Sequence, residues 1–156
     1  MSAPLSATYS FQDVQAGIVA PSATFDLKSA GVSAEGIRVA MLADKDTMTI
    51  GANGDGMHSL AASKAGRIQV SLLKTAPGNA MLNSLYRYQS LSAATWGQIQ
   101  LTVSNPVSGD SITARGGAFQ KQSDLGYMTE GNLNVWAFNF VDIDETLGKT
   151  GLSTAA

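Results

Sequence analysis

The chain has 156 residues, which suits one domain, and it lacks cysteine, so disulfides and thiolate metal sites are excluded. Charged residues are 14% of the chain, against about 25% in typical globular domains, and the formal net charge is −2. Scattered Lys and Arg argue against tight DNA binding, while low charge beside 44% hydrophobic content indicates a surface largely covered by other protein.

Alternation of apolar and polar side chains predicts five strands in the first half of the chain, over residues 8–19, 23–28, 35–42, 46–51 and 66–73. Between the fourth and fifth, the Asn-Gly-Asp-Gly run at 53–56 is a strong turn signal, because Gly and Asn tolerate positive φ. Residues 44–64 are therefore expected to form an extended hairpin or loop arm.

One amphipathic helix is predicted over residues 77–89. Pro77 suits a first helical turn, where its missing N–H costs nothing. Met81, Leu85 and Tyr88 recur at helical spacing and form one apolar stripe. A single stripe implies one buried side, so we expect the helix to pack on a sheet, with Met81 and Leu85 in the core.

Three further strands are predicted, over residues 98–104, 111–120 and 133–143. Gly116 and Gly117 inside the second of these indicate a bulge or a close backbone approach. The last strand places Trp136, Phe138 and Phe140 on one face and apolar side chains on the other, which predicts a central strand covered on both sides. Trp136 and Phe138 are expected in the core.

The predicted fold is mainly β, a β-sandwich or barrel with one flanking helix, formed by residues 1–156 as a single domain. Residues 1–8 are expected to be an N-terminal arm and residues 145–156 a polar C-terminal tail. Exposed strand edges need an explanation in such a fold. Many strands with little charge favour pairing of those edges with neighbouring copies.

No set of residues indicates catalysis or metal binding. His58 is the single histidine; a zinc site would need other ligands and the chain has no cysteine, and no Gly-x-Ser-x-Gly elbow supports a catalytic triad. Asp44, Asp46 and Asp55 border the Gly-rich turn without the spacing of a calcium-binding loop. The carboxylates near the C-terminus are interpreted as a polar strand end: Asp142, Asp144 and Glu145. We predict no catalytic residue, no metal and no cofactor.

Neither targeting nor membrane insertion is expected. No apolar run approaches the roughly 20 residues of a transmembrane helix. The beginning of the chain, MSAPLSATYSF, lacks the basic and apolar regions of a signal peptide.

Four segments resemble one family of phage structural proteins: DKDTMTIGANGDGMHSL, LLKTAPGNAMLNSLY, WGQIQLTVSNPVSGDSITARGGAFQK and NVWAFNFVDIDETLG. The resemblance covers roughly residues 8–148. Members of that family come from contractile-tailed phages and are taken to be tail tube proteins. The resemblance implies a β-sandwich with a flanking helix, as in the tube proteins of type VI secretion systems and pyocins.

The resemblance also implies an assembly and its partners. Subunits of such tubes form six-fold rings, the rings stack into a hollow tube, and strands of all six subunits join into one inner barrel. A sheath protein surrounds the tube, a tape-measure protein fills it before DNA passes, and a baseplate lies at its end. The expected location is the phage tail in the virion, after synthesis in the cytoplasm of the host bacterium.

Two sets of residues are candidates for contacts in that assembly. The arm is expected to reach the neighbouring ring through Met48, Ile50, Asn53, Asp55, Met57 and His58. The alternative is a hairpin folded back onto its own sheet, which would cover the methionines within the subunit. Polar strand faces are candidates for the lumen, which tends to be acidic or neutral in such tubes; these are Gln69, Ser71, Gln98, Gln100 and Thr102.

Other functions stay open on the sequence alone. A type VI secretion-like or pyocin-like tube would share the fold without carrying DNA. A small-ligand β-barrel module would need convergent polar groups in an apolar pocket. A hydrolase using His58 would need a partner nucleophile.

Overall fold

The computed structural model describes residues 8–21, 23–27 and 32–148. Most of the predicted N-terminal arm (residues 1–8) and C-terminal tail (145–156) lies outside these residues. The described part forms a short 3-10 helix, nine strands and one α-helix. Their bounds are η1 Phe11–Asp13, β1 Gln15–Ala20, β2 Ala23–Asp26, β3 Val32–Met41, β4 Asp46–Ile50, β5 Gly56–Leu60, β6 Gly66–Leu72, α1 Gly78–Gln89, β7 Ile99–Asn105, β8 Asp110–Phe119 and β9 Asn134–Thr146.

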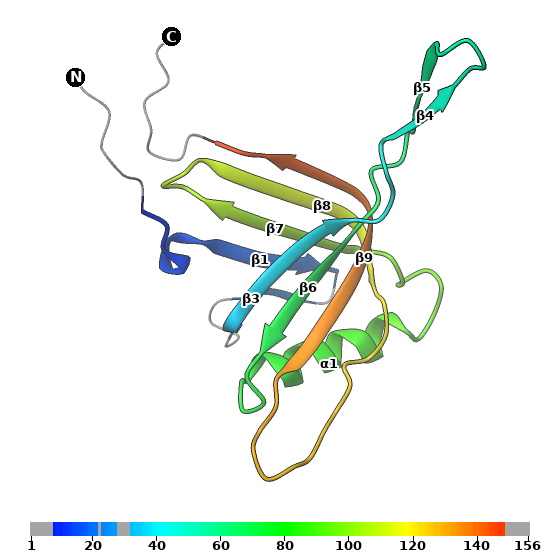
Figure 1. Cartoon of the computed structure of the whole chain (residues 1–156). Helices are drawn as coiled ribbons and strands as arrows, with labels where there is room; N and C mark the ends of the chain where they lie inside the picture. The colour runs from blue at the N-terminus through cyan, green and yellow to red at the C-terminus, as the bar shows by residue number, and fades with distance from the viewer. Residues whose placement is uncertain (1–7, 22, 28–31, 149–156) are drawn as a thin grey trace.

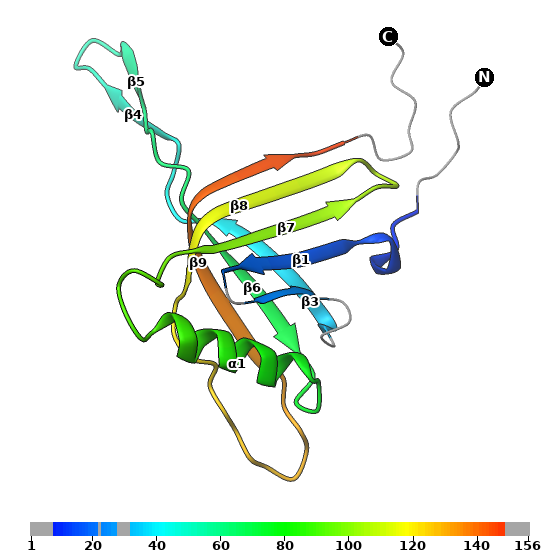
Figure 2. The same ribbon diagram turned by 180° about the vertical axis from the view of Figure 1, so that it is seen from behind.

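Seven strands form one antiparallel sheet in the order β2-β1-β7-β8-β9-β6-β3, and β4 pairs with β5 alone. The mainly β fold with one helix is therefore confirmed, as a sandwich-like arrangement of a single bent sheet. β3, β6 and the first half of β9 form one layer, and β1, β7, β8 and the end of β9 form the other. The first layer is nearer the viewer in Figure 1 and the second is nearer in Figure 2. Within the described residues this sheet is open, with β2 and β3 as its edges.

The long strand β9 joins the two layers. Its residues 134–140 pair with β6, and its residues 138–146 pair with β8. Beside the bend, the pairing of β7 with β8 shifts by one residue, and Gly116 has φ 66°, so the predicted bulge is confirmed. A Cβ atom on the adjacent Gly117 would lie 2.2 Å from the ring of Phe140. The close approach of the two strands thus requires glycine at this position.

The core lies between the two layers and is closed by the helix. Trp136, Phe138 and Leu85 are buried, as the sequence predicted for each of them. Phe119 forms an edge contact with Trp136 at 5.8 Å between ring centroids, and the Trp136 indole Nε1–H donates to Asn79 Oδ1 of the helix at 3.0 Å. This hydrogen bond fixes the helix against β9 while satisfying a buried indole.

The prediction that Met81 lies in the core is wrong, because Met81 is 40% exposed while its neighbour Leu82 is fully buried. The buried positions of α1 are Gly78, Leu82, Leu85 and Gln89, which lie three or four residues apart. Met81 stands about 100° of helical rotation away from Leu82, at the margin of this stripe. Pro77 occupies the N-cap position, one residue before the first helical turn.

The prediction that β9 is covered on both faces is also wrong for the isolated subunit. Val135 and Val141 are 40% and 71% exposed, whereas Trp136, Phe138 and Phe140 on the other face are buried. The single helix contributes Leu82 and Leu85 to the core on the inner side of the sheet. Among the described residues no further element covers Val135 and Val141 on the outer face of β9, although Ala137 between them is buried.

Candidate assembly surfaces

The β4–β5 hairpin projects away from the sandwich at one end of the molecule (Figure 1). Every residue from 41 to 60 is exposed. Its tip is a tight turn in which Gly51 N–H donates to Asp55 O at 2.7 Å and Gly54 has φ 93°. An isolated two-stranded hairpin has marginal stability in water, so a contact with other protein would stabilise this element.

The strand register sorts the hairpin side chains onto two faces. Met48 pairs with His58, Ile50 with Gly56 and Asp46 with Leu60, which places Met48, Ile50 and Leu60 on one face. We call these three residues the apolar arm face; they are 58%, 56% and 83% exposed. Thr47, Thr49, Met57 and Ser59 lie on the opposite face.

The predicted contact residues of the arm are thus only partly brought together. Met48, Ile50 and His58 share one face, while Met57 points to the other. Asn53 and Asp55 lie at the tip, where the Asn53 amide donates to the Asp55 carboxylate at 2.7 Å. The sequence analysis missed Leu60. Pairing the residues on either side of the predicted turn, outward from its tip, would have placed Leu60 on the same face as Met48.

The folded-back hairpin, the alternative interpretation of this segment, does not describe the structure. Folding back would have covered Met48 and Met57 within the subunit, and both are exposed.

His58 does not have the surroundings of a catalytic histidine. Its Nδ1 lies 2.9 Å from Asp46 Oδ2, and the two side chains are 70% and 52% exposed. The described residues contain no group of three or more potential metal-binding side chains. A solvated pair of this kind contributes little free energy and leaves His58 as a surface residue of the arm.

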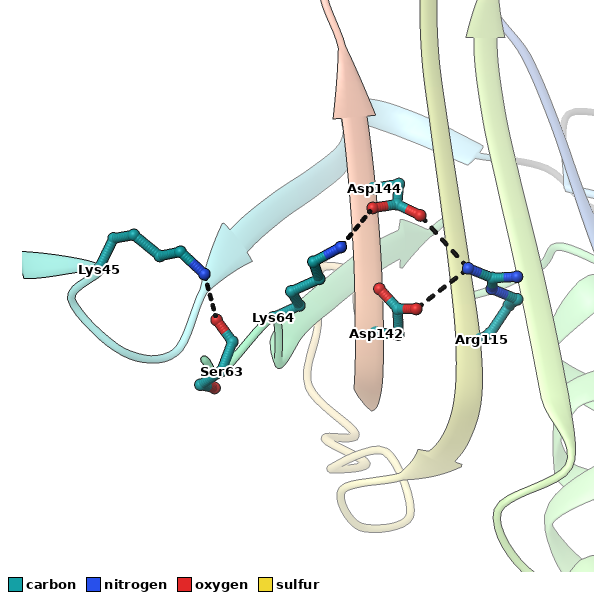
Figure 3. Close-up of polar contacts among 6 residues, drawn as sticks. All are labelled: Lys45, Ser63, Lys64, Arg115, Asp142 and Asp144. Atoms are coloured by element: carbon teal, nitrogen blue, oxygen red, sulfur yellow. Dashed lines mark hydrogen bonds and ion pairs between the residues drawn. The ribbon is translucent and has the colours of Figure 1, made fainter. Parts of the chain in front are cut away.

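The foot of the hairpin is attached to the end of β9. Ile143 N–H donates to Lys64 O at 2.9 Å, and the Lys64 ammonium lies 3.6 Å from Asp144 (Figure 3). Across the stem, Lys45 Nζ donates to Ser63 O at 3.4 Å. These contacts fix where the arm leaves the sandwich.

The two aspartates predicted as a polar strand end share one cation. Arg115 lies 3.0 Å from Asp142 and 3.3 Å from Asp144, as Figure 3 shows. Arg115 and Asp142 are also partners in the register of β8 and β9. The arrangement is an exposed ion-pair network and not a pair of carboxylates facing a shared substrate.

The predicted lumen residues lie on different layers. Gln69 is on the outer face of β6, whereas Gln100 and Thr102 are on the outer face of β7, and Gln98 precedes that strand. Ser71 is only 7% exposed, because a small side chain beside Val135 in a strand paired on both sides presents little area. Ser71 is therefore a poor candidate for any lumen.

A second protruding segment, missed by sequence reasoning, is the long loop between β8 and β9. Leu125, Tyr127 and Met128 are exposed on it. Lys74 organises this loop: its ammonium donates to Gly126 O and lies 4.3 Å from the Tyr127 ring centroid. The signal available in the sequence was a stretch of some dozen residues without a strand or helix pattern, which in compact domains is often functional.

These features define a class of protein. A two-layer β fold whose apolar side chains are displayed on protruding elements is typical of a subunit that completes its packing against other protein. Residues 6–148 match the family model described as bacteriophage PhiTE tail tube protein, and the chain belongs to this family. Its members are structural components of the phage tail.

A solved structure supports the same architecture. The fold is similar to that of a chain in the cryo-electron microscopy structure of the anti-feeding prophage cap, a tube-terminating cap, with a TM-score of 0.56. The match covers 93% of this chain and 96% of that one at 8% sequence identity, so the likeness is one of fold. No curated protein sequence matches the chain.

In the part of the chain that the structure describes, no helix has the length and apolar character needed to span a membrane.

Proposed function

We propose that this chain is the tube subunit of a contractile phage tail, whose six-fold rings stack into a hollow conduit for the genome inside a sheath. The observation that carries the proposal is the apolar arm face. Met48, Ile50 and Leu60 project on an element that its own subunit leaves uncovered. Because the chain belongs to a tail tube family, we expect a second copy of the chain to cover these three side chains.

The energetics favour stacking of whole rings over pairing of single subunits. Each of the three side chains is more than half exposed, so covering it contributes on the order of 1 kcal/mol. Each arm therefore contributes only about 3 kcal/mol, less than the cost of immobilising one subunit. Six arms that engage together share that cost, so the joint becomes favourable through multivalency.

The open edges of the sheet support ring formation. Among the described residues β3 and β2 end the sheet, and β3, ten residues long, directs the backbone groups of alternate residues away from β6. Long uncovered strand edges are places where another strand adds. In the proposed ring, these edges meet neighbouring copies and the strands continue from one subunit to the next.

Further partners follow from the position of such a tube. The sheath contacts its exterior, the tape-measure protein occupies it before DNA, and the baseplate adjoins its end. DNA passes without lasting contacts, and the subunit performs no chemistry. The proposed location is the virion tail, assembled from subunits made in the host cytoplasm.

Deletion of residues 46–60, which removes the apolar arm face with the rest of the hairpin, and closure with a short turn test the proposal. The expected result is soluble subunits or single rings without long tubes, as seen by negative-stain electron microscopy. Thermal unfolding of the deleted subunit should resemble that of the unaltered one, because the hairpin contributes no residue to the core. Tubes of normal length from the deletion would overturn the role of the arm.

The pyocin-like alternative differs in its cargo and not in its fold. In a phage tail, antibodies against this chain should label particles that carry DNA-filled heads. Labelling confined to headless tubes would favour the alternative.

A further inference from the structure

We infer that the apolar arm face docks into an apolar groove at the far end of a second copy of this chain. The groove has a volume of about 260 Å³ and is lined by the apolar or aromatic residues Tyr9, Phe11, Val14, Ile37, Val103 and Ile112 and by the polar residues Ser104, Asn105 and Asp110. The inference rests on the proposed stacking of subunits and names both surfaces of the joint.

A tube built from identical subunits requires both surfaces on one chain. Stacking in one direction repeats a head-to-tail contact, in which the donor surface and the acceptor surface are different parts of the subunit. The acceptor of the arm must therefore lie on this chain, away from the arm itself.

The groove has the required position. Its residues come from η1 and the residues on either side of it, the end of β7, the start of β8 and the middle of β3. Figures 1 and 2 show β7 ending and β8 beginning at the side of the sandwich opposite the hairpin. A copy displaced along this direction brings its hairpin toward the groove of the next.

The chemistry of the groove suits the arm. Its walls include the aromatic rings of Tyr9 and Phe11, and methionine sulfur makes favourable contacts with aromatic rings. Met48 and Ile50 are neighbours on the apolar arm face, so both can face the same groove. Methionine adapts its shape to an irregular cavity, which helps a joint repeated many times.

Two of the three polar side chains at the rim, Asn105 and Asp110, accept hydrogen bonds within the subunit. Asn105 Oδ1 accepts from Val107 N–H at 3.2 Å, and Asp110 Oδ1 accepts from Gly148 N–H at 2.9 Å. Six of the nine lining residues are apolar, so Met48 and Ile50 would bury apolar surface there, while Asp46 and His58 on the same face of the hairpin stay paired with each other.

Two other grooves of the described subunit fit less well. One is lined by Lys45, Lys64 and Glu145 and lies at the foot of the arm, on the same end as the arm itself. The other carries Arg38 and Arg67 on the outer face of the β3–β6 layer, where two guanidinium groups would disfavour apolar side chains.

Cross-linking tests the joint, because the chain contains no cysteine that would interfere. A Tyr9→Cys, Met48→Cys double variant is assembled into tubes and treated with a short bismaleimide. The expected result is a ladder of covalent multimers on a denaturing gel, since a head-to-tail contact links each copy to the next. Each single variant should yield no ladder.

A matched control uses the other face of the hairpin. Thr49 neighbours Met48 but points away from the apolar arm face. The Tyr9→Cys, Thr49→Cys pair should therefore cross-link roughly tenfold more slowly, because its effective concentration at the joint is lower. A second pair, Val103→Cys with Ile50→Cys, repeats the measurement at another point of the groove and applies if the first pair fails to assemble.

The outcomes separate this inference from the proposed function. Tubes that form without a ladder for either pair, or with equal rates for Met48 and Thr49, would show that the groove is not the acceptor, while the tube assignment stands. Failure of the unaltered chain to form any ring or tube would instead contradict the proposed function.

Discussion

At the scale of single residues, close packing at the bend of the sheet depends on two glycines. A Cβ atom on Gly66 would lie 2.4 Å from Ile143 Cδ1, and one on Gly117 would lie 2.2 Å from Phe140 Cε1. Phe140 is nearly fully buried, so its ring has little space into which it could move. These glycines allow the two layers to turn over one core.

Gly117→Ala should therefore destabilise the subunit by about 1–3 kcal/mol through overpacking. Gly56→Ala is the matched control, because its Cβ would meet only Ile50 Cδ1 at an ordinary 3.5 Å on the exposed hairpin. The measurement is the urea midpoint of each subunit. Equal midpoints would show that β8 and β9 tolerate a wider separation than the structure has.

Trp136→Ala should cost about 3–5 kcal/mol, since it removes a buried aromatic side chain and its contact with Phe119. It also removes the hydrogen bond that Asn79 accepts. Trp96→Ala serves as the control, because Trp96 is more than a third exposed and follows the helix. Soluble yield and thermal unfolding report the difference, and normal assembly of Trp136→Ala at normal yield would contradict the central position of β9.

At the scale of elements, contacts within the subunit fix the position of the β4–β5 hairpin but do not bury its side chains. Its position is fixed by contacts at its foot, including the hydrogen bond from Ile143 N–H to Lys64 O. Its tip and both faces lack any contact that buries them. The subunit therefore sets the direction in which the hairpin projects, and in our proposal the next copy covers its apolar side chains.

A charge on the apolar arm face should prevent tube formation, whereas a charge on the other face should not. Met48→Asp would place a carboxylate in an apolar joint, where an unpaired charge is strongly disfavoured. Thr49→Asp, its neighbour on the opposite face, is the control. Sedimentation and electron microscopy measure assembly, and equal loss of tubes in both variants would reject the assignment of faces.

At the scale of the whole molecule, the two layers present different outer faces. The face of Gln69 carries Arg38 and Arg67, and Arg67 donates to Asn139 at 3.2 Å. The face of Gln100 continues through Thr102 and Thr113 to Asp144, whose carboxylate binds Arg115. Since the layers lie on opposite sides of the core, one lumen can be lined by only one of these faces.

Gln69→Lys and Gln100→Lys should therefore differ in their effect on DNA passage. The variant whose lysine faces the lumen should slow genome ejection from purified virions, because a cation there binds passing phosphates. Raising the salt concentration should reduce that delay. If both variants slow ejection equally, or neither does, the assignment of one polar layer to the lumen is wrong.

Much of the fold could be predicted from sequence because its elements have strong local signals. Alternation along β6 and β7, the glycines of the bulge and the apolar stripe of α1 each depend on neighbours within a few residues. Residues of the candidate site were harder to predict. The arm was predicted as a segment, but its two faces depend on the register of β4 with β5. The groove collects residues from four separate elements and from the residues that flank η1.

What the sequence by itself determined was where most strands, the helix and the hairpin turn form, since backbone preferences and side-chain periodicity act locally. The strand predicted over residues 8–19 is an exception, because its first half contains the 3-10 helix Phe11–Asp13 and β1 begins only at Gln15. What only the tertiary structure decided was which side of each element is covered. Val141 and Phe140 are adjacent apolar residues of one strand, yet one is exposed and the other buried. Likewise Met81 is exposed while Leu82 is buried. Burial depends on how layers distant in sequence stack around one core, and alternation alone contains no information about which face finds a partner.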